Sequence, residues 1–535
     1  MKRRLPLLWL FLAIASGYSL WPDEVHHYDD STVKVGTVSF VISCSPQEQK
    51  SVERGIALLH SFLFDGAQMQ FEEAVQKDPG CPMAYWAEAI GLYRPLAYRP
   101  SDSDMKQGWT LVQKAQTLNA KTKREHDYID AAAIFYGSDS RDYETRSRQY
   151  SEAMEKVYRQ YPEDVEAAVF YALSLLALDR ESDHPLANPE QAIEILNRVF
   201  EKNLNHPGVA HYLIHAADTP QLAPLGLEAA RRYAQIAPAA PHALHMPSHI
   251  FARLGLWQDD IQSNLASLDA ARHPVAMHVG AENQMHAMEF LEYAYLQIGA
   301  DHKAEEMVRE QALIGYEEVD KNLVDYLNRT RANSPAMYCL EMRHWKDAAD
   351  LKPDAQAEPY NQAITYWVHA VAAGHLHNPD AAREAARQFD AMVEATKRGP
   401  HPFRAQYMTV KHDEAAAWLA FAEGKNDEAL ELLRPIAEKQ DVEGKGEVEL
   451  PAREMLADML LEMGRSEEAL AEYEKSMKTD PNRFNGLSGA ARAAEMAHQP
   501  DKARSYYAQL LRNCDNGAHS DRPELAHAKF LVVEK

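Results

Sequence analysis

Histidine is the residue of this chain whose number and spacing point most directly to chemistry. The chain has 24 histidines in 535 residues. An imidazole can ligate a metal ion and can accept or donate a proton near neutral pH. The stretch between residues 206 and 286 holds more than twice as many as an even distribution would place there: His206, His211, His215, His242, His245, His249, His273, His278 and His286.

Two pairs of these histidines share one spacing. His211 and His215 are four residues apart, as are His245 and His249, and residues i and i+4 lie on one face of an α-helix. The second pair follows the first by one full unit of the repeat described below. His286 falls at the corresponding place in the following unit. Because equal positions of stacked helices point the same way, we expect these imidazoles to converge on the concave side of the fold.

Such convergence predicts a metal site. Imidazole nitrogen suits zinc, copper and iron. We expect the four paired histidines to hold a divalent transition metal, with His286 nearby. Asp218 follows His215 by three residues and is expected to be either a carboxylate ligand or a partner that orients an imidazole. Glu289 has the same two roles open to it beside His286.

Two other interpretations of the histidine pattern stay open. A groove lined with histidine can bind a polar ligand without metal, and duplication of repeat units can copy a packing residue that has no function. His242, one turn before the second pair, is a further candidate ligand. His206 is expected to have a local role in a turn, and His273 and His278 lie in an insertion between units.

Other catalytic signatures are missing from the sequence. It contains no phosphate-binding loop, no GxSxG nucleophile elbow, no protein-kinase motif set and no HExxH zinc motif. No serine or cysteine nucleophile can be named. His60 is expected to be a buried structural histidine, and His26 and His27 to belong to a polar terminus.

The elements that must position the histidines form a repeat. Ala503 and Tyr507 follow Ala469 and Tyr473 at one identical spacing, and that spacing equals the interval between the two histidine pairs. A small residue at the alanine position lets two antiparallel helices pack closely, and Pro481 ends the second helix because proline lacks an N–H. The same frame recurs upstream, with the small residue of the second helix at Ala67, Ala192, Ala229, Ala304 and Ala429.

This period, about 34 residues, resembles that of tetratricopeptide repeat proteins. The resemblance covers most of residues 50–515. It implies an all-α solenoid, a right-handed superhelix of helix-turn-helix units whose concave surface binds peptides or partner proteins. It implies little about a specific activity. Several blocks are also similar to a group of exported bacterial members: GIALLHSF (55–62), DPGCPMAYW (78–86), HYLIHA (211–216), HMPSHIF (245–251) and NRFNGLSGAARAAE (482–495).

The beginning of the chain resembles a secretory signal. Lys2, Arg3 and Arg4 precede a short apolar run that ends at Ala15, and Ala15-Ser16-Gly17 is a small-residue cleavage site. We therefore expect export to the periplasm or the medium, with an uncleaved anchor as the alternative. No later segment is a continuous apolar span, so no membrane span is expected after removal of the signal.

Four segments follow from these observations. Residues 1–17 are the expected signal peptide, and residues 18–48 an extended segment along the first helices. Residues 49–320 are expected to hold the N-terminal and central repeats with the histidine-rich centre, and residues 321–535 the C-terminal repeats.

The chain has four cysteines, Cys44, Cys81, Cys339 and Cys514. Export permits disulfides, and Cys44 and Cys81 are the expected pair because they flank the first repeat. No C-x-x-C motif is present, so neither a thiolate zinc site nor thioredoxin-like chemistry is indicated.

The formal charge of the chain is −24, which repels phosphate backbones and argues against a nucleic-acid partner. Three functions are compatible with the sequence. The first is an exported scaffold that binds a protein, peptide or other ligand in its concave groove around a histidine-lined centre. The second is a metalloenzyme built on the paired histidines. The third is a structural assembly protein without a small-molecule site.

Overall fold

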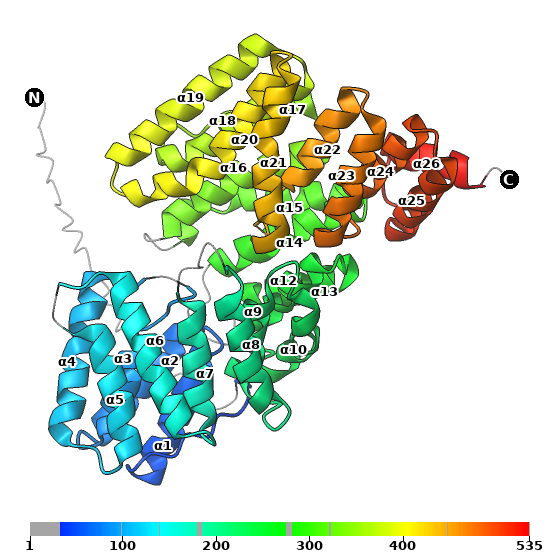
Figure 1. Cartoon of the computed structure of the whole chain (residues 1–535). Coiled ribbons are helices and arrows are strands. Elements are labelled where there is room, and N and C mark those ends of the chain that lie inside the picture. The colour runs from blue at the N-terminus through cyan, green and yellow to red at the C-terminus, as the bar shows by residue number, and fades with distance from the viewer. Residues whose placement is uncertain are drawn as a thin grey trace, which may run out of the picture.

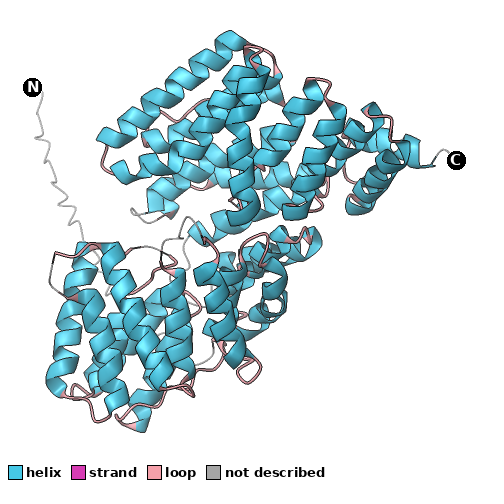
Figure 2. Cartoon of the chain, viewed as in Figure 1, coloured by secondary structure: helices cyan, strands magenta, loops and turns pink. Residues whose placement is uncertain are grey.

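The computed structural model describes residues 33–97, 99–137, 140–178, 184–273, 281–319, 323–446 and 448–533. Within these ranges the chain is helical and has no strand, as Figure 2 shows. The predicted all-α fold is confirmed. The expected signal peptide, His26, His27 and His278 lie outside the described residues.

The first half of the chain, blue to green in Figure 1, holds helices α1 to α13. Their bounds are α1 Pro46–Leu59, α2 Phe64–Lys77, α3 Pro82–Ile90, α4 Asp102–Leu118, α5 Lys123–Tyr136, α6 Tyr143–Gln160, α7 Val165–Leu176, α8 Ala187–Phe200, α9 Pro207–Ala217, α10 Ala223–Ile236, α11 Pro241–His245, α12 Pro247–Arg253 and α13 Trp257–Arg272.

The second half, green to red in Figure 1, runs from α14 to α26 and includes short 3₁₀ helices. Its elements are α14 Ala281–Gln297, α15 Asp301–Leu313, η2 Tyr316–Glu318, α16 Val324–Glu341, α17 Trp345–Asp350, α18 Pro359–His375, α19 Pro379–Arg398, η4 Pro402–Met408, α20 Thr409–Ala422, α21 Asn426–Glu443, α22 Ala452–Glu462, α23 Ser466–Thr479, α24 Phe484–Met496, α25 Pro500–Asn513, η5 Asp515–Gly517 and α26 Pro523–Val533.

Neighbouring helices pack as hairpins, among them α1 with α2, α9 with α10, α22 with α23 and α24 with α25. The small residues that define the repeat frame lie on the second helix of each hairpin. They are all at most 2 % exposed: Ala67, Ala192, Ala229, Ala304, Ala429, Ala469 and Ala503. The predicted tetratricopeptide-type solenoid is therefore confirmed, and the alanines sit where the two helices of a hairpin approach closely.

Two glycines show why the repeat keeps small residues. Gly464 turns the chain between α22 and α23 with a φ of +76°, a conformation that L side chains rarely adopt. Gly489 of α24 lies against the ring of Tyr473, and a Cβ there would be 2.4 Å from the ring. Close packing of consecutive helices thus depends on the missing side chain.

Residues 33–45 form an extended strap that runs along the helices before α1 begins. Alternate apolar side chains of the strap are buried: Val33, Val35, Val38, Phe40 and Ile42. The Thr37 N–H donates to the Asn205 carbonyl at 2.9 Å, and the Ser43 N–H donates to Glu125 at 2.6 Å. The strap thereby connects α1, α5 and the start of α9.

The Cys44–Cys81 disulfide joins the strap to the start of α3. The two Cα atoms are 5.5 Å apart, inside the range that a disulfide spans. The predicted pairing is confirmed, and Cys339 and Cys514 are buried thiols. Closing a loop of 37 residues stabilises a fold by about 3–4 kcal/mol in the chain-entropy account.

The two halves meet where α12, α13 and α14 lie close to α24. Trp257 donates its Nε1–H to the Asn482 carbonyl at 2.8 Å, and α14 contacts α24 directly. The expected boundary at 320/321 falls on residues 320–322, outside the described residues. In the part of the chain that the structure describes, no helix has the length and apolar character needed to cross a membrane.

Candidate metal centre

The first histidine triad consists of His211 and His215 of α9 and His242 of α11. The Nε2 atom of His211 lies 3.0 Å from Nε2 of His242 and 3.1 Å from Nε2 of His215. One ring nitrogen from each residue falls within 4.8 Å of the other two. Three imidazoles from two helices are therefore directed at one point.

A backbone contact fixes the tautomer of His211. Its Nδ1 lies 2.7 Å from the carbonyl oxygen of His60. A carbonyl only accepts, so Nδ1 carries the proton and Nε2 of the neutral ring carries a lone pair. His211 thus turns an unprotonated nitrogen toward the other two imidazoles, which is the form that binds a metal ion.

The second triad consists of His245 of α11, His249 of α12 and His286 of α14. The Nε2 atoms of His245 and His249 are 2.9 Å apart, and the ring centroids of His245 and His286 are 4.2 Å apart. Again one nitrogen from each ring lies within 4.8 Å of the others.

The opposite nitrogens of His245 and His249 face hydrogen-bond acceptors. His245 Nδ1 lies 2.7 Å from Asn264 Oδ1, and the Asn264 amide nitrogen donates to Asp260 at 2.8 Å, which fixes the orientation of the amide. His249 Nδ1 lies 2.9 Å from Asp218 Oδ2. Both Nδ1 atoms therefore donate, and the two facing Nε2 atoms of the neutral rings are both acceptors.

Two lone pairs 2.9 Å apart repel unless a cation lies between them. The nitrogens of the two triads are 2.9–3.1 Å apart. A metal ion with bonds of about 2.0–2.1 Å to two such nitrogens would have an N–metal–N angle of roughly 90–100°. Such angles are compatible with a metal that has at least one further position open. The donor geometry of both triads thus fits an ion without rearrangement of the helices.

Asp218 lies outside both groups of converging nitrogens. Its Oδ2 accepts from His249 Nδ1, and its Oδ1 accepts from Arg253 Nε at 2.9 Å. Of the two roles expected from the sequence, it therefore occupies that of a partner that orients an imidazole.

Glu289 has a similar place beside His286. The hydroxyl of Tyr326 lies 3.3 Å from His286 Nδ1 and donates to Glu289 at 3.1 Å. Arg329 pairs with the same carboxylate at 3.1 Å. Burial alone would raise the pKa of Glu289, but Arg329 and His286 outweigh it and lower the pKa, so the carboxylate is charged and paired.

One phenylalanine contacts all three rings of each triad. The Phe62 centroid lies 4.5 Å from that of His211, 6.0 Å from His215 and 4.5 Å from His242. The Phe290 centroid lies 4.6 Å, 5.0 Å and 5.3 Å from the rings of the second triad. Phe62 holds this place with a φ of +56°, a rare conformation for a bulky residue that persists only where the surroundings impose it.

The buried position keeps the imidazoles neutral. Burial lowers the pKa of His211, His242 and His245 well below the ordinary value, and the neighbouring histidines lower it further. Because a protonated imidazole cannot ligate, these shifts make the rings available to a metal at neutral pH.

The structure divides the expected histidines differently from a single shared site. Each i, i+4 pair takes its third partner from the first helix of the next repeat unit: His242 of α11 joins the first pair and His286 of α14 joins the second. His245 and His249 do not share one continuous helix, because α11 ends at His245 and α12 begins at Pro247. The four paired histidines and their two further partners thus form two adjacent triads.

The other described histidines of the region, His206 and His273, are not members of the triads. His273 is exposed and contacts Asp269. His206 caps α9, accepting from the Val209 N–H at 3.3 Å, as its expected local role requires. Phe62, Phe290 and Asn264 had no sequence signal, whereas the spacing of His242 one turn before His245 had suggested it.

A third cluster, His60, Glu166 and His206, is complete without an ion. His60 Nε2 and His206 Nε2 contact the two oxygens of Glu166 at 3.0 Å and 2.6 Å, and His60 Nδ1 contacts the Tyr212 hydroxyl at 3.0 Å. Burial lowers the pKa of His60. His60 is thus the buried structural residue that the sequence predicted, and its carbonyl supports His211.

A pocket of about 420 Å³ borders the first triad. His215, Asp218 and Arg253 form one side of it, and Lys445 lies at the side of the second half of the chain. Apolar residues of α7 and its surroundings complete the wall: Leu96, Leu175, Leu176 and Leu178. The pocket is large enough to hold a small molecule beside the half-buried His215.

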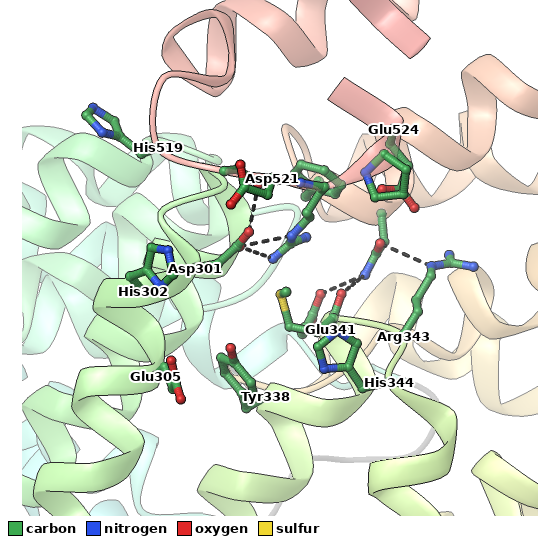
Figure 3. A pocket seen from close by; sticks show the side chains of 16 residues that line it. Asp301, His302, Glu305, Tyr338, Glu341, Arg343, His344, His519, Asp521 and Glu524 are labelled. Atoms are coloured by element: carbon green, nitrogen blue, oxygen red, sulfur yellow. Dashed lines mark hydrogen bonds and ion pairs between the residues drawn. The ribbon is translucent and has the colours of Figure 1, made fainter. Parts of the chain in front are cut away.

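A second pocket, of about 480 Å³, lies between α15, α16, the start of α24 and the segment that precedes α26, and Figure 3 shows it. No triad residue lines it. Its acidic side chains are largely paired: Asp301 with Arg522 at 2.7 Å and Glu341 with Arg483 at 2.8 Å. The Asp301–Arg522 pair holds the C-terminal segment on α15, and the Glu341–Arg483 pair joins α16 to the start of α24, which gives the pocket a structural explanation.

Comparisons with known proteins return only distant structural similarity. No family model and no curated protein matches the chain. The human IFIT1 dimer with PPP-AAAA matches at 12% identity and a TM-score of 0.36, over 86% of this chain and 89% of that one. The human IFIT1 dimer with m7Gppp-AAAA matches at 14% identity and a TM-score of 0.35, over 81% and 90%. Similarity at this level gives no information about the ligand of this chain, and its function is inferred from the triads.

Proposed function

We propose that this chain is an exported solenoid scaffold that binds two transition-metal ions, one in each histidine triad. The observation that carries the proposal is the orientation of His211, His245 and His249. Contacts on the far side of these rings place their protons at Nδ1, away from the centre. The Nε2 atoms of His245 and His249 then face each other at 2.9 Å, and that of His211 faces His242 and His215 at 3.0 Å and 3.1 Å, a geometry that a cation stabilises.

The donor set favours zinc, copper, iron or nickel. Both triads consist of imidazole alone, whereas calcium and magnesium prefer oxygen ligands. A ring that donates from Nδ1 to a carboxylate or a carbonyl is a common feature of histidine ligands, because the contact orients the ring and increases its basicity. Asp218 and the His60 carbonyl supply such contacts here.

Export to the periplasm or the medium is part of the proposal. The basic and apolar start of the chain supports it, and so does the Cys44–Cys81 disulfide, since disulfides persist in oxidising compartments. Mass spectrometry of the native N-terminus tests it: we expect loss of residues 1–17, and an intact Met1 on a cytoplasmic protein would contradict it.

Metal analysis of the purified protein tests the central claim. We expect two transition-metal ions per chain after loading and removal of excess metal. His215→Ala and His249→Ala should each reduce the content to one ion, because each removes one ligand from a different triad. His273→Ala is the matched control and should retain two, since His273 is exposed and remote from both triads. Retention of two ions by both ligand variants, with an unchanged circular dichroism spectrum, would refute the assignment.

A metal-dependent enzyme is the second candidate function. The pocket at His215 favours it, because catalytic metal sites keep a coordination position open to a small molecule while structural sites are closed. Cobalt(II)-loaded protein tests this: added azide should alter the visible absorption of an open site. An unchanged spectrum would leave the scaffold as the better account, with a polypeptide or other partner in its groove.

A further inference from the structure

The charge around the two triads restricts which ions can occupy both at once. All six ligands are imidazoles, and the two carboxylates that contact them, Asp218 and Glu289, are already paired with guanidinium groups. Asp218 pairs with Arg253 at 2.9 Å, and Glu289 pairs with Arg329 at 3.1 Å. The surroundings therefore supply little net negative charge for two closely spaced cations.

The triads are also close to each other. His242 of the first and His245 of the second are three residues apart, on the same short helix α11, and their ring centroids are separated by 6.3 Å. Side chains at i and i+3 are neighbours on a helix surface. Two ions bound to these residues would lie against one turn of α11. Neither of the two described triads includes a carboxylate.

Two divalent ions would bring four positive charges into this buried space without an anionic ligand. Coulomb repulsion between them is large where water is scarce. Two monovalent ions carry half of this charge. Among the metals that imidazole binds, copper has a stable monovalent state. A small dianion between two divalent ions would reach the same total.

We propose that the two triads form one dinuclear copper centre that binds dioxygen between the ions. The inference rests on the proposed function, because it requires that both triads bind metal. It adds the identity of the metal and the class of small molecule that the centre takes.

The binding step is balanced in electrons and needs no further reactant. Each Cu(I) gives one electron to dioxygen, which becomes a peroxide dianion, and each copper becomes Cu(II). The new bonds join copper to oxygen, and the O–O π bond is lost. No proton is needed, and the total charge of metals and ligand stays at +2.

The apolar surroundings suit such a centre. Phe62 and Phe290 each cover one triad with ring contacts to all three imidazoles, which restricts water at the ions. His286 has a side chain 36% exposed, and His215 borders the pocket. A small neutral molecule such as dioxygen thus has a path on either side.

Anaerobic loading with Cu(I) followed by exposure to air tests the proposal. We expect two copper ions per chain, uptake of one dioxygen per two copper ions, and no electron paramagnetic resonance signal from the oxygenated protein, because the bridged Cu(II) spins couple. His249→Ala, which leaves the first triad intact, should bind one copper and lose the uptake at this ratio. His273→Ala is again the control and should behave as the parent protein.

The possible results separate this inference from the proposed function. Two bound copper ions that give the full signal of two independent Cu(II) spins, or that take up no dioxygen, would overturn the dinuclear centre and leave the metal-binding scaffold standing. Absence of any bound metal, with copper, zinc or cobalt, would overturn both. Equal uptake by His249→Ala would show that one triad suffices and would also overturn the shared centre.

Discussion

The second half of this molecule and the junction of its halves each bury a polar cluster, and the two clusters differ in how their members are paired. In the second half, Arg483 lies 1% exposed between Glu341 and Glu454, at 2.8 Å and 3.0 Å. Each charge there has an opposite charge beside it. At the junction of the halves, the Nε2 atoms of His245 and His249 face each other at 2.9 Å while both rings donate from Nδ1. The comparison assigns the Arg483 cluster to the fold and supports the proposal that the triads bind metal ions.

The largest effect is expected where the Arg483 cluster is broken. Arg483→Met should lower the free energy of unfolding by roughly 3–5 kcal/mol, because it removes the cation that lies between two buried carboxylates. Urea unfolding measures it. Arg504→Met, which breaks an exposed pair with Asp501, is the control and should cost at most about 1 kcal/mol. Similar costs for both variants would contradict the distinction drawn here.

Metal should stabilise the triads and leave the Arg483 cluster unaffected. A ligand at 100 times its Kd stabilises the folded state by about 2.7 kcal/mol per site. We expect a chelator to reverse the gain, His215→Ala to lose the part due to its triad, and Arg483→Met to show the full gain from its lower baseline. Thermal unfolding with and without Cu(I), in the absence of oxygen, gives the comparison, and an equal shift in a variant that lacks both triads would refute it.

The partners that orient the imidazoles should have an intermediate effect. Asp218→Asn removes the charge opposite His249 Nδ1 and should weaken metal binding by roughly 10- to 100-fold. Asp269→Asn alters a similar aspartate beside the exposed His273 and should leave affinity unchanged. Competition with a coloured chelator measures both, and equal affinities for the two variants would show that Asp218 has no such role.

The smallest effect is expected from a mild drop in pH on the metal-free protein. The pKa values of His211, His242 and His245 are lowered in the fold. Below about pH 6.5 the unfolded chain takes up protons that the folded chain does not, so these residues lower the stability as the pH falls.

Two buried carboxyls act in the opposite direction. Burial raises the pKa of Glu88 and of Glu414 to about 7, so the folded chain binds more protons there. The comparison must therefore be made between the parent protein and His242→Phe in urea unfolding from pH 7.5 to 5.5. The parent should lose more stability over this range than the variant, and parallel curves would contradict the prediction.

The sequence by itself determined the architecture and the neighbourhood of the site. The repeat spacing of Ala469 and Ala503 predicted helical hairpins because a small residue is needed wherever two helices approach closely. The i, i+4 spacing of His211 and His215, repeated one unit later, predicted that four imidazoles gather. The hairpins formed by α3 to α6 lack this alanine signal and were not predicted individually.

Only the tertiary structure decided how the histidines divide. The third member of each triad comes from the first helix of the following repeat unit, His242 from α11 and His286 from α14. Phe62 and the His60 carbonyl reach His211 from the end of α1 and the turn after it, far earlier in the chain. The local period carries no information about such contacts, because they depend on how the solenoid brings α1 against α9. The tautomer of His211, which supports the metal proposal, follows from the distant His60 carbonyl.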